Sequence, residues 1–200
     1  NINDSYFDGY YKEIWKTIIP EELTVKEVNF MLSYFHLEPG SNVLDLMCGY
    51  GRHAFGLSRK GVKVTAVDNL AAYIDEINRK VLEENLPVTT IQQNILDFET
   101  DEQYDLAICM GNSLNFFNAA DVRKIFSMVS SCLKPGGQLL INSWSLAEIV
   151  FRTFKESGSS TIGNMQFAVQ SAISFQPARM ETSSTITRAD GKTEEKTAVD

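Results

Sequence analysis

The stretch VLDLMCGYGRHA, from Val43 to Ala54, decides the fold. An apolar run that carries one acid, Asp45, gives way to two glycines one residue apart, Gly49 and Gly51. Glycines at such a place let the backbone approach a ligand closely and present amide N–H groups where the next helix starts. The stretch therefore predicts a buried strand, a ligand-binding loop and a helix, in that order.

The rest of the central region repeats this alternation of strand and helix. Near-continuous apolar runs predict buried parallel strands at 42–48, 63–68, 88–94, 104–111 and 137–144. Between them, apolar residues three or four positions apart predict helices over 71–84 and 119–133. The pattern predicts an α/β fold in which helices cover both faces of a doubly wound parallel sheet.

The two ends of the chain have a different pattern. Thr24 can cap a helix, and Asp190-Gly191 provides a hairpin turn between alternating segments near the end of the chain. We expect three parts: an N-terminal helical lid segment over 1–35, a ligand-binding α/β domain over 36–155, and an antiparallel β extension over 156–200.

Composition narrows the class of partner. The 200 residues are 44% hydrophobic, which suits one buried core, and the formal net charge of −8 disfavours nucleic acid as a partner. The first residues lack a signal-peptide pattern, and no apolar run has the length of a membrane helix. Three cysteines suggest free thiols in a reducing compartment, so we expect a cytoplasmic protein. No metal site is predicted.

Polar residues follow the first two predicted strands where each one ends. Asp45 can hold the glycine loop or accept a ligand's ammonium. Asp68 lies seventeen residues beyond Gly51, the place where an acid accepts hydrogen bonds from the ribose hydroxyls of an adenosine. Asn69 and Leu70 would lie beside the adenine. A single acid at a strand end also fits a cap or a turn, so the prediction depends on several such signals in the right order.

The next two strands end in similar residues. The Asn94 amide oxygen could accept the adenine amino group, and Ile95 could add a backbone N–H and an apolar wall. The residues expected to face the reacting centre are Met110, Gly111 and Asn112. Cys48, within the loop, is grouped with the ligand-binding residues, although it also fits a small core residue, as Cys109 does. His53 and His36 fit structural or solvated positions better than catalytic ones.

In these residues the chain resembles class I S-adenosylmethionine-dependent methyltransferases, which have a Rossmann-like sheet. The resemblance rests on VLDLMCGYGRHA, VTAVDNL, QQNILDF, YDLAICMGNSLNFF and LKPGGQLLINSW, which occur in order over residues 42–144. It implies S-adenosylmethionine as the cofactor, bound at Gly49 and Gly51, with Asp68 on the ribose and Asn94 with Ile95 at the adenine. The family usually ends in further strands, so we expect the chain to be truncated.

The chain is similar in particular to glycine N-methyltransferases, through YFDGYYKEIW near the start and GNSL at 111–114. The likeness implies that Tyr6 and Trp15 help to close over the cofactor and that Asn112 lies by the acceptor amine. Two positions depart from the family: no arginine stands near Trp144 to hold the glycine carboxylate, and Thr24 stands where the family has another arginine. An apolar or aromatic acceptor therefore fits at least as well as glycine.

The predicted function is methyl transfer to the N or O atom of a small-molecule acceptor by in-line displacement. Asn112 and Tyr6 are the candidates for orienting the acceptor, and no dedicated general base stands out. Three alternatives stay open: a protein that binds S-adenosylmethionine or S-adenosylhomocysteine without catalysis, a nicotinamide-dependent oxidoreductase, and a protein or nucleic-acid methyltransferase. These motifs do not specify the acceptor or the oligomeric state.

Overall fold

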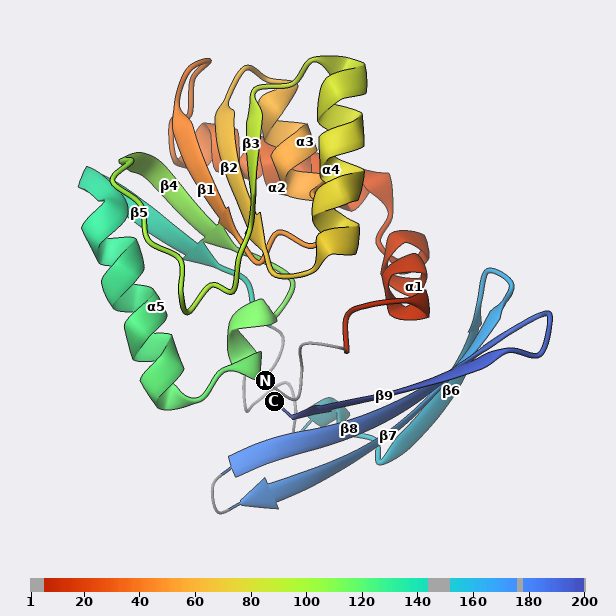
Figure 1. The fold of residues 1–200 in the computed structure, drawn as a ribbon. Helices are drawn as coiled ribbons and strands as arrows, with labels where there is room; N and C mark the ends of the chain where they lie inside the picture. The colour runs from red at the N-terminus through yellow and green to blue at the C-terminus, as the bar shows by residue number, and fades with distance from the viewer. Residues whose placement is uncertain (1–5, 144–151, 176–177, 200) are drawn as a thin grey trace. The chain divides into compact units, whose positions relative to one another are not determined.

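A five-stranded parallel sheet forms the centre of the fold (Figure 1). The computed structural model describes residues 6–143, 152–175 and 178–199. The sheet has the order β3-β2-β1-β4-β5, made of β1 (Asn42–Leu46), β2 (Lys63–Asp68), β3 (Val88–Gln92), β4 (Tyr104–Cys109) and β5 (Leu133–Ile141). All four pairings are parallel. The predicted doubly wound sheet is therefore confirmed, with β1 at its centre.

Helices pack on both faces of this sheet, as predicted. They are α2 (Glu21–Tyr34), α3 (Arg52–Ser58), α4 (Ala71–Glu84) and α5 (Ala119–Cys132), with a 3-10 turn η1 (Ser113–Phe116) after β4. Alternate residues of β1 enter two separate cores. Val43 packs with Val28 of α2 and Leu57 of α3. Leu44 packs with Ile125 of α5 on the opposite face. Burial on both faces explains why the strands are apolar almost throughout.

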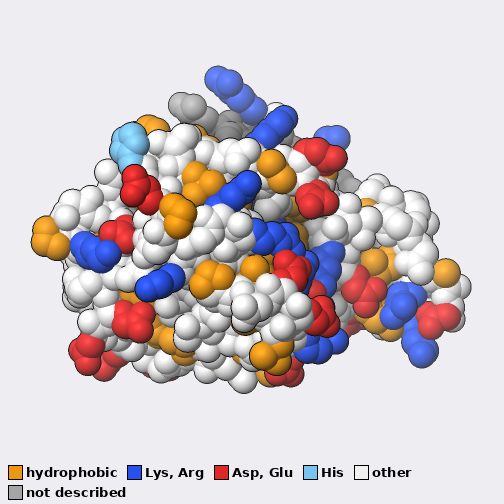
Figure 2. All heavy atoms as spheres, turned by 90° about the horizontal axis from the view of Figure 1, so that it is seen from above, with side chains coloured by type: hydrophobic (Ala, Val, Ile, Leu, Met, Phe, Trp, Pro, Cys, Tyr) orange, Lys and Arg blue, Asp and Glu red, His pale blue; other side chains and the backbone are white. Residues whose placement is uncertain are grey.

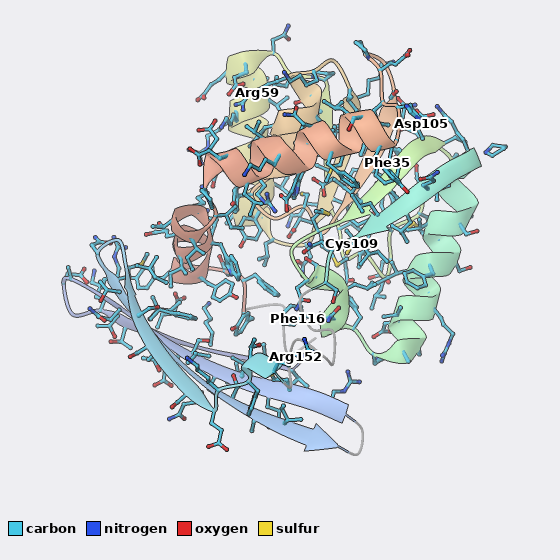
Figure 3. All side chains as sticks on the ribbon, turned by 180° about the vertical axis from the view of Figure 1, so that it is seen from behind. Phe35, Arg59, Asp105, Cys109, Phe116 and Arg152 are labelled. Atoms are coloured by element: carbon cyan, nitrogen blue, oxygen red, sulfur yellow. The ribbon has the colours of Figure 1, made fainter. Side chains whose placement is uncertain are left out.

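Hydrogen bonds to the carboxylate of Asp105, labelled in Figure 3, join three strands where their amino ends meet. Its carboxylate accepts the Asn42 backbone N–H at 2.8 Å and the Lys134 ammonium at 2.8 Å. The predicted fifth strand, 137–144, begins earlier than expected, at Leu133, while Trp144 lies outside the described residues. The pairing with β4 shifts register between Tyr104 and Leu106, and this irregularity accommodates the LKPGG residues within the strand.

A second sheet is antiparallel and consists of β6 (Ser157–Ile162), β7 (Met165–Phe175), β8 (Ala178–Arg188) and β9 (Thr193–Val199). It forms one compact unit of the chain together with helix α1 (Tyr10–Ile18). The β8–β9 hairpin turns at the predicted Asp190-Gly191, where the Gly191 N–H donates to the Arg188 carbonyl at 2.9 Å. The N-terminal segment packs on this sheet: the Tyr10 N–H donates to Glu194 at 2.8 Å, and the Tyr6 hydroxyl lies 3.2 Å from that of Ser184.

The contacts between residues divide the chain into two compact units, and the boundaries of these units differ from those of the three predicted parts. Residues 1–20 and 144–200 form one unit, and residues 21–143 form the other. Helix α2 therefore belongs with the parallel sheet rather than with the segment that precedes it. The assignment of a lid function to the N-terminal segment stays a prediction.

The surface drawn in Figure 2 carries basic and acidic side chains that are interspersed rather than gathered by sign. In the described part of the chain, no helix has the length and apolar character needed to cross a membrane.

Candidate functional site

The loop between β1 and α3 makes a tight turn at the carboxyl edge of the parallel sheet. Met47, Gly49 and Gly51 have positive φ angles of 53°, 55° and 78°. The Cys48 N–H donates to the Val67 carbonyl at 3.0 Å, and the Gly51 N–H donates to the Cys48 carbonyl at 3.1 Å. These bonds hold the loop against the end of β2 and lead the chain into α3.

The two glycines of this loop have different surroundings. A Cβ atom on Gly51 would lie 2.8 Å from Cγ1 of Ile77 in α4, so this glycine is needed for close packing. A Cβ atom on Gly49 would meet no atom within 4 Å. This open space leaves room for a ligand to approach the backbone at Gly49, and the contact with the cofactor stays a prediction.

Asp68, at the end of β2, holds the glycine loop in place. One carboxylate oxygen accepts the Gly49 N–H at 2.9 Å, and the other accepts the Leu70 N–H at 3.0 Å. Burial raises the pKa of Asp68, while bonds from the backbone N–H groups of Leu70, Gly49 and Asn69 act in the opposite direction. Gly49, Asp68 and Leu70 therefore form one hydrogen-bonded group at the ends of β1 and β2, and the Asp68 carboxylate retains acceptor capacity for a ribose hydroxyl.

Asp45 is buried on the α3 side of β1, with an exposed fraction of 1%. Its carboxylate accepts the backbone N–H of Ala54, whereas Oδ2 is buried with no hydrogen-bond partner among the described residues. Burial raises the pKa of Asp45 to about 7; the charge of Asp68 adds to this effect and that of Arg52 opposes it. A buried acceptor without a donor fits a site that receives a ligand's N–H group.

Charged residues from α2 and α3 meet behind the glycine loop. The Arg52 guanidinium donates from Nη1 to Thr24 Oγ1 at 3.0 Å and forms an ion pair with Glu27. The same Glu27 oxygen lies 3.0 Å from His53 Nε2. Burial alone would raise the pKa of Glu27, but the bonds from His53 and Arg52 outweigh it and lower that pKa to about 2. Burial lowers the pKa of His53, which favours its neutral form.

The sequence analysis did not identify Glu27 or Arg52. Two signals were available in the sequence. Glu27 is an acid beside Val28, in a helix whose apolar positions face the core, and Arg52 is the basic residue that begins α3 directly after the second glycine. The expected cap was wrong, because α2 begins at Glu21 and Thr24 lies inside the helix. Val28 and Met31 of this helix are buried, whereas Val25 is 50% exposed.

The residues after β3 are fixed by local bonds. The Asn94 side-chain oxygen accepts the Leu96 N–H at 3.0 Å, and its backbone carbonyl accepts the Asp97 N–H at 2.9 Å. Ile95 is buried in the core on the α5 side. The amide oxygen expected to bind adenine thus already accepts one backbone donor and retains one lone pair.

After β4, Met110 leads into a turn in which Gly111 and Asn112 have positive φ angles of 73° and 70°. The buried Asn112 donates its backbone N–H to the Asn142 carbonyl at 3.3 Å, and its side-chain oxygen accepts the Ser143 hydroxyl at 3.3 Å. Bonds to the end of β5 therefore hold Asn112 at the same edge of the sheet as the glycine loop.

The thiols of the two cysteines nearby have raised pKa values, which lowers their reactivity. Burial raises the pKa of Cys109, at the end of β4 (Figure 3), to about 12. Burial and the charges of Asp45 and Asp68 also raise the pKa of Cys48 well above its usual value. Neither thiol is an activated nucleophile.

Tyr6 and Trp15 belong to the antiparallel unit. Their rings pack against Tyr11, with centroid distances of 4.6 and 5.8 Å. Their predicted contact with the cofactor stays a prediction.

The parallel unit also has a cavity of about 460 Å³ at the opposite edge of the sheet, lined by residues that include Thr65, Val88 and Tyr104. It contains none of the predicted site residues, so we place the site at the carboxyl edge, where ligands bind in open parallel sheets. Within the described ranges, no three His, Cys, Asp or Glu side chains are grouped so that they could hold a metal ion.

Comparisons with known proteins find similarity over the same part of the chain, the one that forms the parallel sheet. Residues 43–137 match a family model described as a methyltransferase domain. A carboxy-S-adenosyl-L-methionine synthase from Yersinia enterocolitica is 26% identical over 151 residues, which are 70% of this chain and 56% of that protein. The chain thus spans about half the length of the curated relatives it matches.

Two solved structures share the fold. An S-adenosylmethionine-dependent methyltransferase from Clostridium acetobutylicum has a TM-score of 0.74 at 20% identity, covering 95% of this chain and 78% of that one. CalS10, an amino pentose methyltransferase from Micromonospora echinaspora solved with S-adenosylmethionine bound, has a TM-score of 0.71 at 18% identity, covering 96% and 81%.

Proposed function

We propose that the chain is a class I S-adenosylmethionine-dependent methyltransferase that transfers the cofactor's methyl group to a small-molecule acceptor, because residues 43–137 match a methyltransferase domain and the chain shares the fold of solved methyltransferases. S-adenosylmethionine, its cofactor, supplies an electrophilic methyl group on a sulfonium sulfur. The acceptor atom in this proposal is a nitrogen or an oxygen.

The observation that supports this function best is the junction of β1 and β2. Asp68 ties the glycine loop to the end of β2, and the buried Oδ2 of Asp45, in β1, has no donor in the described part of the chain. An adenosine with an amino-acid end carries the complementary groups: ribose hydroxyls that donate to Asp68 and an ammonium that donates to Asp45. We infer that Asn94 and Ile95 line the adenine and that Met110 and Gly111 lie near the reacting centre.

In the proposed reaction the acceptor attacks in line with the bond to the leaving thioether, which needs no acid. The protein's task is to position the acceptor and exclude water. Asn112 suits the positioning role because bonds to β5 fix its side chain, while its amide nitrogen can donate to an acceptor. Tyr6 and Trp15 are proposed to complete the site from the N-terminal segment.

The test is transfer of a labelled methyl group from S-adenosylmethionine to a panel of amines, phenols and carboxylates. We expect turnover with at least one class, and we expect Asn112→Ala to lower kcat while the affinity for S-adenosylhomocysteine holds. Cofactor binding without transfer to any acceptor would instead support the non-catalytic binding protein. Binding of NADH in place of S-adenosylhomocysteine would support the oxidoreductase.

The likeness to carboxy-S-adenosyl-L-methionine synthases favours a second candidate, a reaction in which a carboxyl donor gives its carboxyl group to the cofactor in exchange for a hydrogen, without transfer of the methyl group from sulfur. The two functions differ in their products. Methyl transfer yields S-adenosylhomocysteine and a methylated acceptor, whereas the second reaction yields a cofactor that is heavier by a carboxyl group. Mass spectrometry of the nucleoside products distinguishes them.

The proposed setting is cytoplasmic, which the cysteine chemistry supports. Cys48, Cys109 and Cys132 all lie within the described ranges and carry free thiols. The proposed acceptor is apolar or aromatic at least as readily as glycine, because the chain has no arginine near Trp144 to hold the glycine carboxylate.

A further inference from the structure

Three polar side chains meet where β4 and β5 end, in the turn between Cys109 and Phe116, which are labelled in Figure 3. The hydroxyl oxygen of Ser143, two positions beyond the end of β5, lies 3.3 Å from Oδ1 of Asn112 and 3.2 Å from Oδ1 of Asn115. Asn112 is buried, and the other two residues are half-buried. The sequence analysis assigned a role to Asn112 only, so Ser143 and Asn115 are unassigned.

The backbone of Asn112 is fixed, whereas its side-chain amide has two possible orientations. Its φ angle is 70°, its N–H donates to the Asn142 carbonyl at 3.3 Å, and its carbonyl accepts the Asn115 N–H at 3.1 Å. The last torsion of an asparagine has broad, roughly two-fold minima, so the backbone alone does not fix the amide. The two ends of the amide differ, because the oxygen accepts hydrogen bonds and the NH₂ group donates them. The orientation of this amide therefore decides which group Asn112 offers to an acceptor.

Ser143 supplies a bond that sets this orientation. Its hydroxyl donates to Oδ1 of Asn112, so the oxygen is turned toward the end of β5 and the NH₂ group occupies the other corner of the amide, whatever else contacts it. In the sheet, β4 lies between β5 and β1, the strand that leads into the glycine loop. The bond to Ser143 therefore holds the Asn112 oxygen on the side of β4 that is opposite to β1.

Asn115 competes with Asn112 for this hydrogen bond. A serine hydroxyl has one hydrogen, and the two amide oxygens lie at nearly equal distances from the hydroxyl oxygen, 3.3 and 3.2 Å. The hydrogen can be donated fully to only one of the two oxygens at a time. The strength of the bond that holds the Asn112 amide therefore depends on Asn115 as well as on Ser143.

We propose that Ser143 is a positioning residue for methyl transfer, which holds the Asn112 amide in one orientation toward the acceptor, and that Asn115 weakens this hold by sharing the hydroxyl hydrogen. The assignment rests on the proposed function, since it presumes that Asn112 contacts the acceptor. Ser143 acts on the acceptor only through Asn112 in this arrangement.

A purely structural role, in which Ser143 ties the turn after β4 to the end of β5, predicts a different behaviour. Loss of the bond to Asn112 or of the bond to Asn115 would then loosen the same turn and lower activity in both cases. In the positioning role the two losses have opposite effects, because removal of the Asn115 side chain leaves the whole hydrogen to Asn112.

The first experiment measures labelled methyl transfer to the amine, phenol or carboxylate that reacts fastest in the panel of the proposed function. Ser143→Ala should lower kcat by about tenfold, from the loss of one hydrogen bond, and change KM by less than about twofold. Ser143→Thr keeps the hydroxyl and should restore kcat to within about threefold of the wild type. Asn115→Ala should give a kcat equal to or above that of the wild type. Ser113→Ala is the matched control: it removes a hydroxyl of the same turn that donates to the Met110 carbonyl at 3.0 Å, and it should keep kcat within about twofold.

The second experiment needs no acceptor. Carbon-13 NMR of the free protein observes the side-chain carbonyl carbon of Asn112, which is assigned from its absence in Asn112→Ala. A hydrogen bond to a carbonyl oxygen withdraws electron density from the carbon. We therefore expect this signal to move upfield in Ser143→Ala and to return toward its wild-type position in Ser143→Thr.

Three results would overturn the proposal: a kcat of Ser143→Ala within about twofold of the wild type, an equal loss of kcat in Asn115→Ala, or an Asn112 carbon signal that does not move in Ser143→Ala. If Ser143→Ala does not fold, Ser143→Cys replaces it, because a thiol is a weak donor of similar size; its carbon signal should also move upfield, and an unchanged position counts against the assignment. If no member of the panel is methylated while the carbon signal moves as expected, the result counts against the proposed function instead.

Discussion

The carboxylate of Asp68, at the end of β2, accepts the backbone N–H of Gly49 at 2.9 Å. This bond connects two residues that the sequence assigned to the cofactor site, one in the glycine loop and one at the ribose. Asp68 therefore sets the position of the glycine loop in addition to any contact that it makes with a ligand. A variant at this position is expected to affect loop geometry and cofactor binding together.

Replacement of Asp68 by Asn should weaken binding of S-adenosylhomocysteine by about tenfold or more. An amide has one oxygen, so it can accept only one of the N–H groups of Gly49 and Leu70, and its own NH₂ would face the other donor. We expect the free energy of unfolding to fall by about 1–2 kcal/mol. Calorimetry and urea unfolding measure the two effects. Asp75→Asn, an exposed change in α4, should alter neither, and an affinity of Asp68→Asn within twofold of the wild type would contradict the assignment.

The two loop glycines should respond differently to substitution by alanine. Gly51→Ala places a Cβ atom 2.8 Å from Ile77 and adds the cost of a positive φ, so we expect unfolding to become easier by about 2–3 kcal/mol. Gly49→Ala meets no protein atom and should cost about 1 kcal/mol, from φ alone. Its methyl group enters the space for the ligand, so it should lower affinity for S-adenosylhomocysteine more than it lowers stability. Equal stability losses in the two variants would contradict this distinction.

Much of this site could be predicted because its signals are local. A glycine pair after an apolar run and an acid after the next run each report a strand end, and parallel pairing brings strand ends to one edge. The hairpin at Asp190-Gly191 is local in the same sense, because the turn chemistry is contained in two residues.

The network around Glu27 could not be predicted in this way. Glu27 and Arg52 lie 25 positions apart in the chain and meet only because α2 packs across α3. Helical periodicity reports which residues face inward, but it does not report which charged residue on a neighbouring helix will stand opposite. The start of β5 was missed for a related reason: the register shift beside Tyr104, and not the local Pro-Gly-Gly signal, decides where pairing with β4 begins.

The stability of the protein should depend on pH through Asp45. Its pKa is raised from 3.8 to about 7 in the folded state, so the folded protein binds this proton more tightly than the unfolded chain. The resulting stabilisation is complete below pH 3.8 and is lost as the pH rises through about 7. Relative to Asp45→Asn, the wild type should lose roughly 2–3 kcal/mol between pH 5 and pH 8. Urea unfolding of both proteins at several pH values measures this difference, and parallel curves would contradict it.

Glu27 should give the opposite pH dependence. Its pKa is lowered from 4.5 to about 2, so the folded state favours the charged carboxylate. This stabilisation is present above pH 4.5 and is lost as the pH falls toward 2. Glu27→Gln should therefore lower the free energy of unfolding by roughly 1–3 kcal/mol at pH 7, and the difference from the wild type should shrink in acid.

The matched control for this change is Glu84→Gln, which removes the exposed partner of Arg59 and should leave stability nearly unchanged at either pH. Glu27→Gln leaves Thr24 as the remaining hydrogen-bond partner of the Arg52 guanidinium among the described residues. An equal stability loss in Glu27→Gln at pH 7 and in acid would contradict the assignment of this stability to the ionised carboxylate of Glu27.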